Sequence, residues 1–206
     1  PSHYSVKRME GKKRCKEALQ QRLGLNVEAD TPIIAIVSRL VSHKGLDLVC
    51  KAFDEIMSLH CQFVVLGSGD YAYEQFFESK LQWLPGRMAL YRGYNEDLAM
   101  QIYAGADLFL MPSKSEPCGL SQMIAMRYGT VPIVRETGGL KDTVHPYEAW
   151  CGAGNGFTFA DYNSGDMAYV IRQAVDLYHN NRDAFKQLQY HGMTTDFSWD
   201  RSAQAY

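Results

Sequence analysis

Short runs of β-branched and apolar residues alternate along this chain with stretches whose apolar residues recur at helical spacing. An unbroken apolar run such as Ile33–Val37 is typical of a strand that is covered on both faces. Pro132 indicates that its own run lies at the start of a strand or at a sheet edge. The predicted strands are Ile33–Val37, Phe63–Leu66, Met88–Tyr91, Leu108–Met111, Val131–Val134 and Phe157–Phe159.

Helices are expected between these strands. Leu46 to Met57 has apolar residues at helical spacing. Asn95 is typical of a helix N-cap, with Glu96 and Asp97 in the first turn and Gly105 at the end. Further helices are predicted from Leu120 to Gly129, from a Ser164 cap to about Leu177, around Phe185 and Leu188, and at Trp199–Tyr206.

Alternating strands and helices predict an α/β fold with a parallel sheet. About six strands suggest a doubly wound, Rossmann-like sheet, in which ligands bind beyond the carboxyl ends of the strands. The 206 residues fit one domain, predicted to span 1–206. Residues 7–22 hold seven Lys or Arg against two Glu, which predicts either a solvated helix or an arm that packs elsewhere.

Charge and cysteine usage exclude several classes of protein. A net charge of −2 and a pI near 6.3 give no basic field for nucleic acid or an anionic membrane. No apolar run approaches the roughly 20 residues of a membrane span, and no signal peptide opens the chain. Five cysteines, an odd number without CxxC spacing, argue against a disulfide scaffold or zinc ribbon and fit a reducing compartment.

Two cations follow the first predicted strand. Arg39 leaves its carboxyl end and Lys44 lies five residues later, near a helix start. Cations converging on a helix N-terminus suit a diphosphate, although a solvent-facing Arg and a surface Lys fit the same spacing. Gly67-Ser68-Gly69 after the second strand is an incomplete GxGxxG, and taken alone these glycines indicate a plain tight turn. Because no Gly-rich turn follows strand one, the pattern argues against a nicotinamide dehydrogenase.

The loop after strand four, Pro112–Ser121, is the most informative segment. The first helix amides, near Gly119, Leu120 and Ser121, would form a nest for an anionic or hydroxyl oxygen. Glu116 would bond sugar hydroxyls there or face a transient cation. The alternative for Glu116 is a helix N-terminal charge worth a few tenths of a kcal/mol. The Cys118 thiol is either a nucleophile, for which no nearby histidine supplies a base, or a filler of space beside the ligand.

Two further segments complete the predicted site. Gly93-Tyr94, after strand three, offers an aromatic face that either stacks on a purine or packs. Thr137-Gly138, after strand five, opens a second helix start. Two cations, helix starts and one carboxylate at a single edge predict a nucleotide-diphosphate-sugar site. No metal is expected, because the cations would neutralise the phosphates and no carboxylate pair or histidine cluster is present.

The motif SEPCGLSQMIAMRYGTVPIVRETGGLKDTV (115–144) resembles that of bacterial glycogen synthases and plant starch synthases. VSRLVSHKGLD (37–47), LGSGD (66–70) and YAGADLFLMPS (103–113) agree with that family in order and spacing. The resemblance covers the chain from about Tyr4 to Tyr206. It implies a retaining glucosyltransferase of GT-B fold, of which this chain would be the C-terminal, nucleotide-sugar-binding half. The implied donor is ADP-glucose, and the implied acceptor is the non-reducing end of an α-1,4-glucan.

The resemblance also implies roles for the predicted site. Arg39 and Lys44 would hold the donor diphosphate and stabilise the leaving group during front-side attack, and Glu116 would bond the transferred glucose. The other implied substrate contacts are Gly93 and Tyr94 at adenine, Cys118, Gly119, Leu120 and Ser121 along the sugar and phosphate, and Thr137 and Gly138 near the distal phosphate. No cofactor beyond the donor substrate is implied.

The chain departs from that family in lacking the N-terminal acceptor domain with its Lys-containing glycine-rich motif. Because it also begins at Pro1, it is expected to be a fragment that binds donor without transferring glucose. Two alternatives stay open, a UDP-glucose-dependent GT-B transferase with a small acceptor and a non-catalytic sugar-nucleotide or glucan-binding module. Bacterial cytoplasm is expected in preference to plastid stroma.

Overall fold

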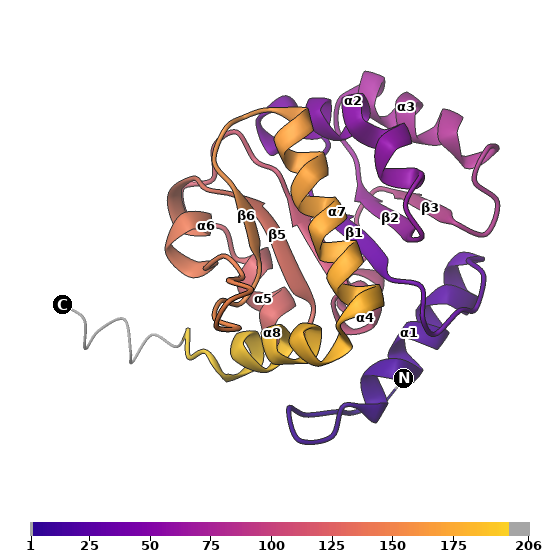
Figure 1. The fold of residues 1–206 in the computed structure, drawn as a ribbon. Helices are drawn as coiled ribbons and strands as arrows, with labels where there is room; N and C mark the ends of the chain where they lie inside the picture. Colours follow the sequence, from indigo (N-terminus) through magenta and orange to yellow (C-terminus); the bar gives the residue numbers. More distant parts are fainter. Residues whose placement is uncertain (1, 198–206) are drawn as a thin grey trace.

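The six predicted strands all form and pair in parallel in one sheet (Figure 1). The structure, a computed structural model, describes residues 2–197. The strand order is β3-β2-β1-β4-β5-β6, so the chain winds outward from β1 to β3 and then returns to the other side of β1. This order confirms the doubly wound, Rossmann-like prediction. The strands are β1 (Ile33–Val37), β2 (Gln62–Gly67), β3 (Met88–Arg92), β4 (Leu108–Met111), β5 (Val131–Arg135) and β6 (Phe157–Phe159).

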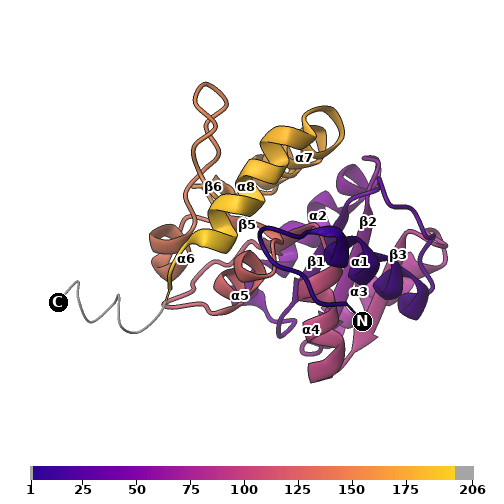
Figure 2. The same ribbon diagram turned by 90° about the horizontal axis from the view of Figure 1, so that it is seen from below.

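Helices cover both faces of the sheet, and Figure 2 shows α7 and α4 on opposite sides. They are α1 (Glu10–Leu23), α2 (Leu46–Met57), α3 (Tyr71–Leu81), α4 (Glu96–Gly105), α5 (Ser121–Arg127), α6 (Gly138–Thr143), α7 (Ser164–Asn180) and α8 (Arg182–Thr194), with a short 3₁₀ helix η1 (Ser42–Lys44). Among residues 2–197 no helix has the length and apolar character that crossing a membrane requires.

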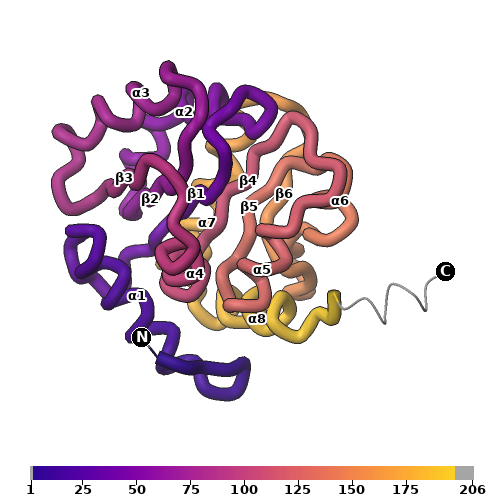
Figure 3. The backbone as a smooth tube through the Cα atoms, turned by 180° about the vertical axis from the view of Figure 1, so that it is seen from behind, coloured from indigo at the N-terminus to yellow at the C-terminus, as the bar shows by residue number. Residues whose placement is uncertain are grey.

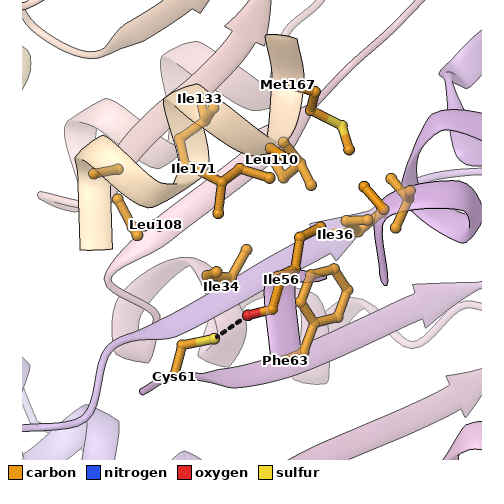
Figure 4. Packing of buried hydrophobic residues seen from close by; sticks show 14 of the residues in the cluster. Ile34, Ile36, Ile56, Cys61, Phe63, Leu108, Leu110, Ile133, Met167 and Ile171 are labelled. Carbon is orange, nitrogen blue, oxygen red and sulfur yellow. Dashed lines mark hydrogen bonds between the residues drawn. The ribbon is translucent and has the colours of Figure 1, made fainter. Parts of the chain in front are cut away.

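Successive side chains of a strand point to opposite faces, and β1 divides its residues between two cores accordingly. Ile34 and Ile36 belong to the core beneath α2 and α7, which Figure 4 shows from close by. Ile33 and Ala35 belong to the core beneath α1 and α4. An entirely apolar β1 is therefore required, because neither face of this strand meets water.

Several element predictions differ in detail from the structure. The α3 helix was not predicted as a separate element, because of its eleven residues only Phe77 is fully buried and the helical pattern is weak. Asn163 and not Ser164 caps α7, by accepting a hydrogen bond from the Asp166 N–H at 3.0 Å. The Asn95 cap is confirmed by its bond from the Leu98 N–H at 2.9 Å. The helix predicted at 199–206 lies outside the described residues.

The structure decides between the alternatives left open for Pro132 and for the basic segment 7–22. Pro132 lies near the start of β5, which pairs with both β4 and β6, so it is at a strand start and not at a sheet edge. The basic segment 7–22 forms α1, which packs along α4 of this same domain. Lys12 and Lys16 are buried there, so the prediction of a solvated helix is wrong.

Candidate functional site

The candidate site lies where the strand order reverses, between β1 and β4, at the carboxyl ends of the strands. A pocket of about 140 Å³ opens there, and its lining includes Arg39, Lys44, Ser113 and Ser121. The crevice at such a reversal is the usual ligand site of doubly wound sheets, because the loops of the two neighbouring strands diverge to opposite faces and leave room between them. The two predicted cations therefore line one pocket.

Lys44 and Glu116 form an ion pair at this pocket. The Lys44 Nζ lies 2.7 Å from the Glu116 Oε2, and the Ser113 hydroxyl donates to the same oxygen at 3.2 Å. Both charged side chains are largely shielded, with exposed fractions of 21% and 12%. Glu116 thus has a specific partner and is more than a helix-terminal charge. Its pairing with Lys44 also reduces the repulsion that a carboxylate would exert on a phosphate.

Close contact between two backbone segments positions Lys44. Gly45 has φ +79°, and a Cβ on it would lie 2.0 Å from the Pro112 carbonyl oxygen. Only glycine therefore permits both this left-handed turn and this approach. The Lys114 N–H donates to the His43 carbonyl at 2.9 Å and ties the same two loops together. Lys44 is carried by a turn that is docked directly on the loop bearing Glu116.

A second glycine contact fixes that loop from its other side. Gly138, with φ +48°, would place a Cβ 2.2 Å from the Glu116 carbonyl oxygen. The Gly139 N–H donates to this oxygen at 3.1 Å, and the Thr137 N–H donates to Arg135 at 2.9 Å. The start of α6 therefore supports the 116–118 segment. Because the Thr137 amide is already bonded inside the protein, a contact from this residue to a ligand would have to come from its hydroxyl.

The start of α5 presents backbone donors. Within residues 2–197 the N–H groups of Cys118, Gly119, Leu120 and Ser121 donate to no protein acceptor. The buried Gln122 side chain holds this turn by donating to the Gly119 carbonyl at 2.9 Å and to the Thr143 hydroxyl at 3.1 Å. The predicted amide nest is thus compatible with the geometry, and the Leu120 and Cys118 side chains beside it are exposed.

Gly93 and Tyr94 do not line this pocket. The Gly93 N–H donates to Gly67 at 3.0 Å, and the Tyr94 side chain is 73% exposed. A weaker connection to the site runs through Tyr103 of α4. Burial raises the pKa of Tyr103, a hydrogen bond with Ser121 opposes this shift, and Tyr94 adds to it.

Three polar residues that build the site are not predicted from the sequence: Ser113, Gln122 and Arg135. The Arg135 guanidinium donates to the Lys114 carbonyl at 2.9 Å and so braces the loop before Glu116. Arg135 ends β5 as Arg39 follows β1, so the same strand-end argument would have found it. In the described part of the chain the buried Gln122 Oε1 and Arg135 Nε have no hydrogen-bond partner.

No group of three or more His, Cys, Asp or Glu side chains in residues 2–197 is arranged to hold a metal ion. All five cysteines are free thiols. The charged side chains that line the pocket are Arg39 and Lys44. Glu116 is not among the lining residues and reaches the site through its ion pair with Lys44.

Comparison with known proteins identifies the family. The model of the family "Glycosyl transferases group 1" matches residues 8–191, and the chain belongs to this family. It is 51% identical over 205 residues to a glycogen synthase of Bacillus cereus, of which it covers 43%. It is 52% identical over 188 residues to a glycogen synthase of Desulfitobacterium hafniense, of which it covers 40%. The chain therefore spans less than half the length of these relatives.

Solved structures place the fold within a larger architecture. The catalytic domain of starch synthase IV from Arabidopsis thaliana, bound to ADP and acarbose, matches 99% of this chain with a TM-score of 0.91 and 37% identity, and the match covers 43% of that domain. A sucrose-phosphate synthase from Thermosynechococcus elongatus, at 22% identity and a TM-score of 0.68, shows the same fold. The chain corresponds to the C-terminal half of the GT-B fold, as the sequence predicts.

Proposed function

We propose that this chain is the donor-binding domain of a retaining glucosyltransferase that moves glucose from ADP-glucose to the non-reducing end of an α-1,4-glucan. The glycogen synthase relatives and the starch synthase that binds ADP and acarbose support this substrate pair. The observation that carries the proposal is the grouping of Arg39 with the Lys44–Glu116 ion pair at the β1–β4 reversal. The two cations can neutralise the charge of a diphosphate, and the carboxylate can accept hydrogen bonds from the hydroxyl groups of a sugar ring.

The proposed chemistry follows from these charges. The donor diphosphate binds between Arg39 and Lys44, and the free amides from Cys118 to Ser121 bond the phosphate and sugar oxygens. Glu116 accepts a hydrogen bond from a glucose hydroxyl while it keeps Lys44 oriented. As the bond from the anomeric carbon to the phosphate oxygen breaks, negative charge grows on the diphosphate. The two cations stabilise this charge in place, which is the usual origin of a large catalytic effect.

The acceptor side of the reaction is assigned to a second domain. Because the chain covers 43% of the length of a glycogen synthase, we propose that donor binding resides here and that glucosyl transfer requires the other half of the GT-B fold. The proposal includes a place in the bacterial cytoplasm, since the glycogen synthase relatives are bacterial. Cations replace a metal in this scheme, and no cofactor is required.

Calorimetric titration with ADP, UDP and ADP-glucose tests the proposal. The chain is expected to bind ADP more tightly than UDP, and Arg39→Ala is expected to weaken ADP binding. The matched control is Arg14→Ala, which removes an equal charge from the exposed face of α1, away from the pocket. Glu116→Gln is expected to keep ADP binding and to lose the additional affinity for the glucose of ADP-glucose.

Each other outcome of this titration excludes one part of the proposal. If the chain binds UDP more tightly than ADP, the proposed donor is UDP-glucose and not ADP-glucose. Binding of glucan with no nucleotide affinity, unchanged in Arg39→Ala, would make the chain a non-catalytic glucan-binding module. If Arg39→Ala and Arg14→Ala lose ADP binding equally, the pocket lined by Arg39 is not the ADP-binding site.

A further inference from the structure

A separate cavity lies at the amino ends of the strands, at the opposite edge of the sheet from the candidate donor site. Its volume is about 430 Å³, within the range of small-molecule sites. Asp107, which directly precedes β4, and Asp30, which precedes β1, are part of its lining. The helices α1 and α8 supply most of its other walls, and Figures 1 and 3 show both at the same end of the sheet.

Basic side chains outnumber acidic ones in the lining of this cavity. Lys12, Lys13 and Lys16 come from α1, and Arg182 and Lys186 come from α8. Five cationic side chains therefore face two carboxylates. Such an excess within one cavity concentrates positive potential, because the low-dielectric walls reduce screening by water.

The two buried lysines of this cavity differ in how they are satisfied. The Lys16 Nζ reaches three acceptors, the Asp107 carboxylate at 2.9 Å, the Tyr178 hydroxyl at 2.9 Å and the Ala29 carbonyl at 3.0 Å. An ammonium has three protons to donate, so Lys16 is saturated. Although burial alone lowers the pKa of Lys16, its contacts with Asp107 and Tyr178 raise this pKa above its ordinary value.

Lys12 lacks an equivalent carboxylate. Its Nζ donates to the Ala104 carbonyl and to the Thr130 hydroxyl, each at 2.9 Å, and both acceptors are neutral. No carboxylate of residues 2–197 lies within 4.0 Å of it. The Lys12 side chain is 94% buried, and one of its three protons has no acceptor within the described residues. A buried cation in this state is costly unless an anion joins it.

We propose that this cavity is a binding site for a small phosphate monoester, held by Lys12 together with Lys13, Arg182 and Lys186. A phosphate monoester carries nearly two negative charges at neutral pH and presents three acceptor oxygens, which matches the charge excess and the free Lys12 proton. Val6, Met9 and Met193 supply apolar surface for the organic part of the ligand. The site is separate from the donor pocket and does not depend on the donor proposed above.

Binding of the anion is coupled to protonation of Lys12. Burial lowers the pKa of Lys12 to about 7, and its neighbours Asp107 and Cys15 raise it while Lys16 lowers it further. The ring of Tyr4 lies 5.7 Å from the Nζ, and the contacts from α4 and Thr130 are uncharged. An anion at the Nζ favours the charged amine. Binding therefore takes up protons near pH 7.5 and weakens as the pH rises further.

The test is calorimetric titration of the chain with inorganic phosphate and with ribose 5-phosphate, with ribose as the neutral control. Ribose 5-phosphate is expected to bind with a Kd near 1 mM or below, and ribose is expected not to bind. Arg39→Ala in the donor pocket is expected to leave this affinity unchanged, whereas Lys12→Met lowers it at least about tenfold through the loss of one charge-assisted hydrogen bond. In two buffers of different ionisation enthalpy the wild type shows proton uptake, and Lys12→Met shows none.

A rim variant keeps the test decisive if Lys12→Met does not fold. Lys13 and Lys186 are both exposed, and Lys13→Ala/Lys186→Ala is expected to weaken ribose 5-phosphate binding about tenfold. The matched control, Arg14→Ala/Lys51→Ala, removes the same charge from exposed positions outside the cavity and is expected to bind as the wild type does. Absence of binding up to about 10 mM, or loss of binding in Arg39→Ala alone, overturns the proposal.

Discussion

Two lysine–carboxylate pairs stand at opposite edges of the sheet. Lys16 and Asp107 meet at the amino edge, and Lys44 and Glu116 meet at the carboxyl edge. Their ion-pair distances are 2.9 and 2.7 Å, so the contacts are alike in length. The exposed fractions are 6% and 10% at the amino edge, against 21% and 12% at the carboxyl edge.

The surroundings of the two pairs decide what each can do. Every proton of the Lys16 ammonium has a protein acceptor, and Asp107 also accepts from the Ile33 N–H at 2.9 Å. That pair fastens α1 to the start of β1 and β4. The Lys44 ammonium has Glu116 as its partner and lines an open pocket. A saturated ion pair holds a fold together, whereas one with free bonding capacity can exchange partners with a ligand.

The largest expected effect is on stability at the amino edge. Lys16→Met leaves Asp107 buried without its cation, and the free energy of unfolding is expected to fall by about 3–5 kcal/mol. Lys44→Met is the matched variant and is expected to cost less, because the Lys44 side chain is 21% exposed against 6% for Lys16. Urea denaturation measures both. Equal losses in the two variants would contradict the contrast between the pairs.

Ligand affinity is expected to follow the opposite order. Removing Arg39 or Lys44 lowers ADP affinity, and in an enzyme with both domains each deletion is expected to raise the barrier to transfer by about 2–4 kcal/mol. Arg39→Ala, whose side chain is exposed, is expected to unfold at the same urea concentration as the wild type. A variant at this edge that loses stability and keeps full ADP affinity would be evidence against a donor site.

Replacement of Tyr94, at the carboxyl edge of the sheet, is expected to have a smaller effect on ADP affinity. Since its ring is 73% exposed, Tyr94→Ala is expected to leave the free energy of unfolding unchanged within about 0.5 kcal/mol. Loss of stacking on adenine lowers ADP affinity by about 1–3 kcal/mol, to judge from base–aromatic contacts in general. Tyr94→Phe keeps the ring and should bind ADP as the wild type does. Titration of all three proteins detects whether the ring takes part.

The smallest expected effect is on pH dependence, and it separates Lys12 from Lys16. Burial lowers the pKa of folded Lys12 to about 7 from an ordinary 10.5. Between these values the unfolded chain binds more protons at this residue than the folded chain does, so Lys12 makes the free energy of unfolding increase with pH. From pH 7 to 9 its contribution is about 2 kcal/mol.

Lys12→Met removes that contribution, and denaturation curves at pH 7, 8 and 9 measure the difference between variant and wild type. Lys16→Met is the control, because the pKa of Lys16 is raised and its proton stays bound in this range. A difference between Lys12→Met and wild type that stays constant from pH 7 to 9 would contradict the low pKa of Lys12.

The sequence predicts the elements of this fold well where apolar periodicity is strong. All six strands were located because parallel strands buried on both faces leave unbroken apolar runs. Arg39, Lys44 and Ser121 line one pocket, because residues that follow buried parallel strands gather at a single edge. Their roles in binding stay predictions. The pattern failed for α3, where only Phe77 is fully buried and the polar surface masks the period.

What the sequence determined by itself is therefore local: the strands, most helices, the capping by Asn95 and the positions just after each strand. The tertiary structure decided which of these meet. Lys44 pairs with Glu116 across 72 residues because β4 lies beside β1. Lys12 and Lys16 are buried because α1 packs along α4 and closes the amino edge. Such contacts depend on strand order and helix docking, which gain their free energy from long-range burial, and no local pattern of residues records them.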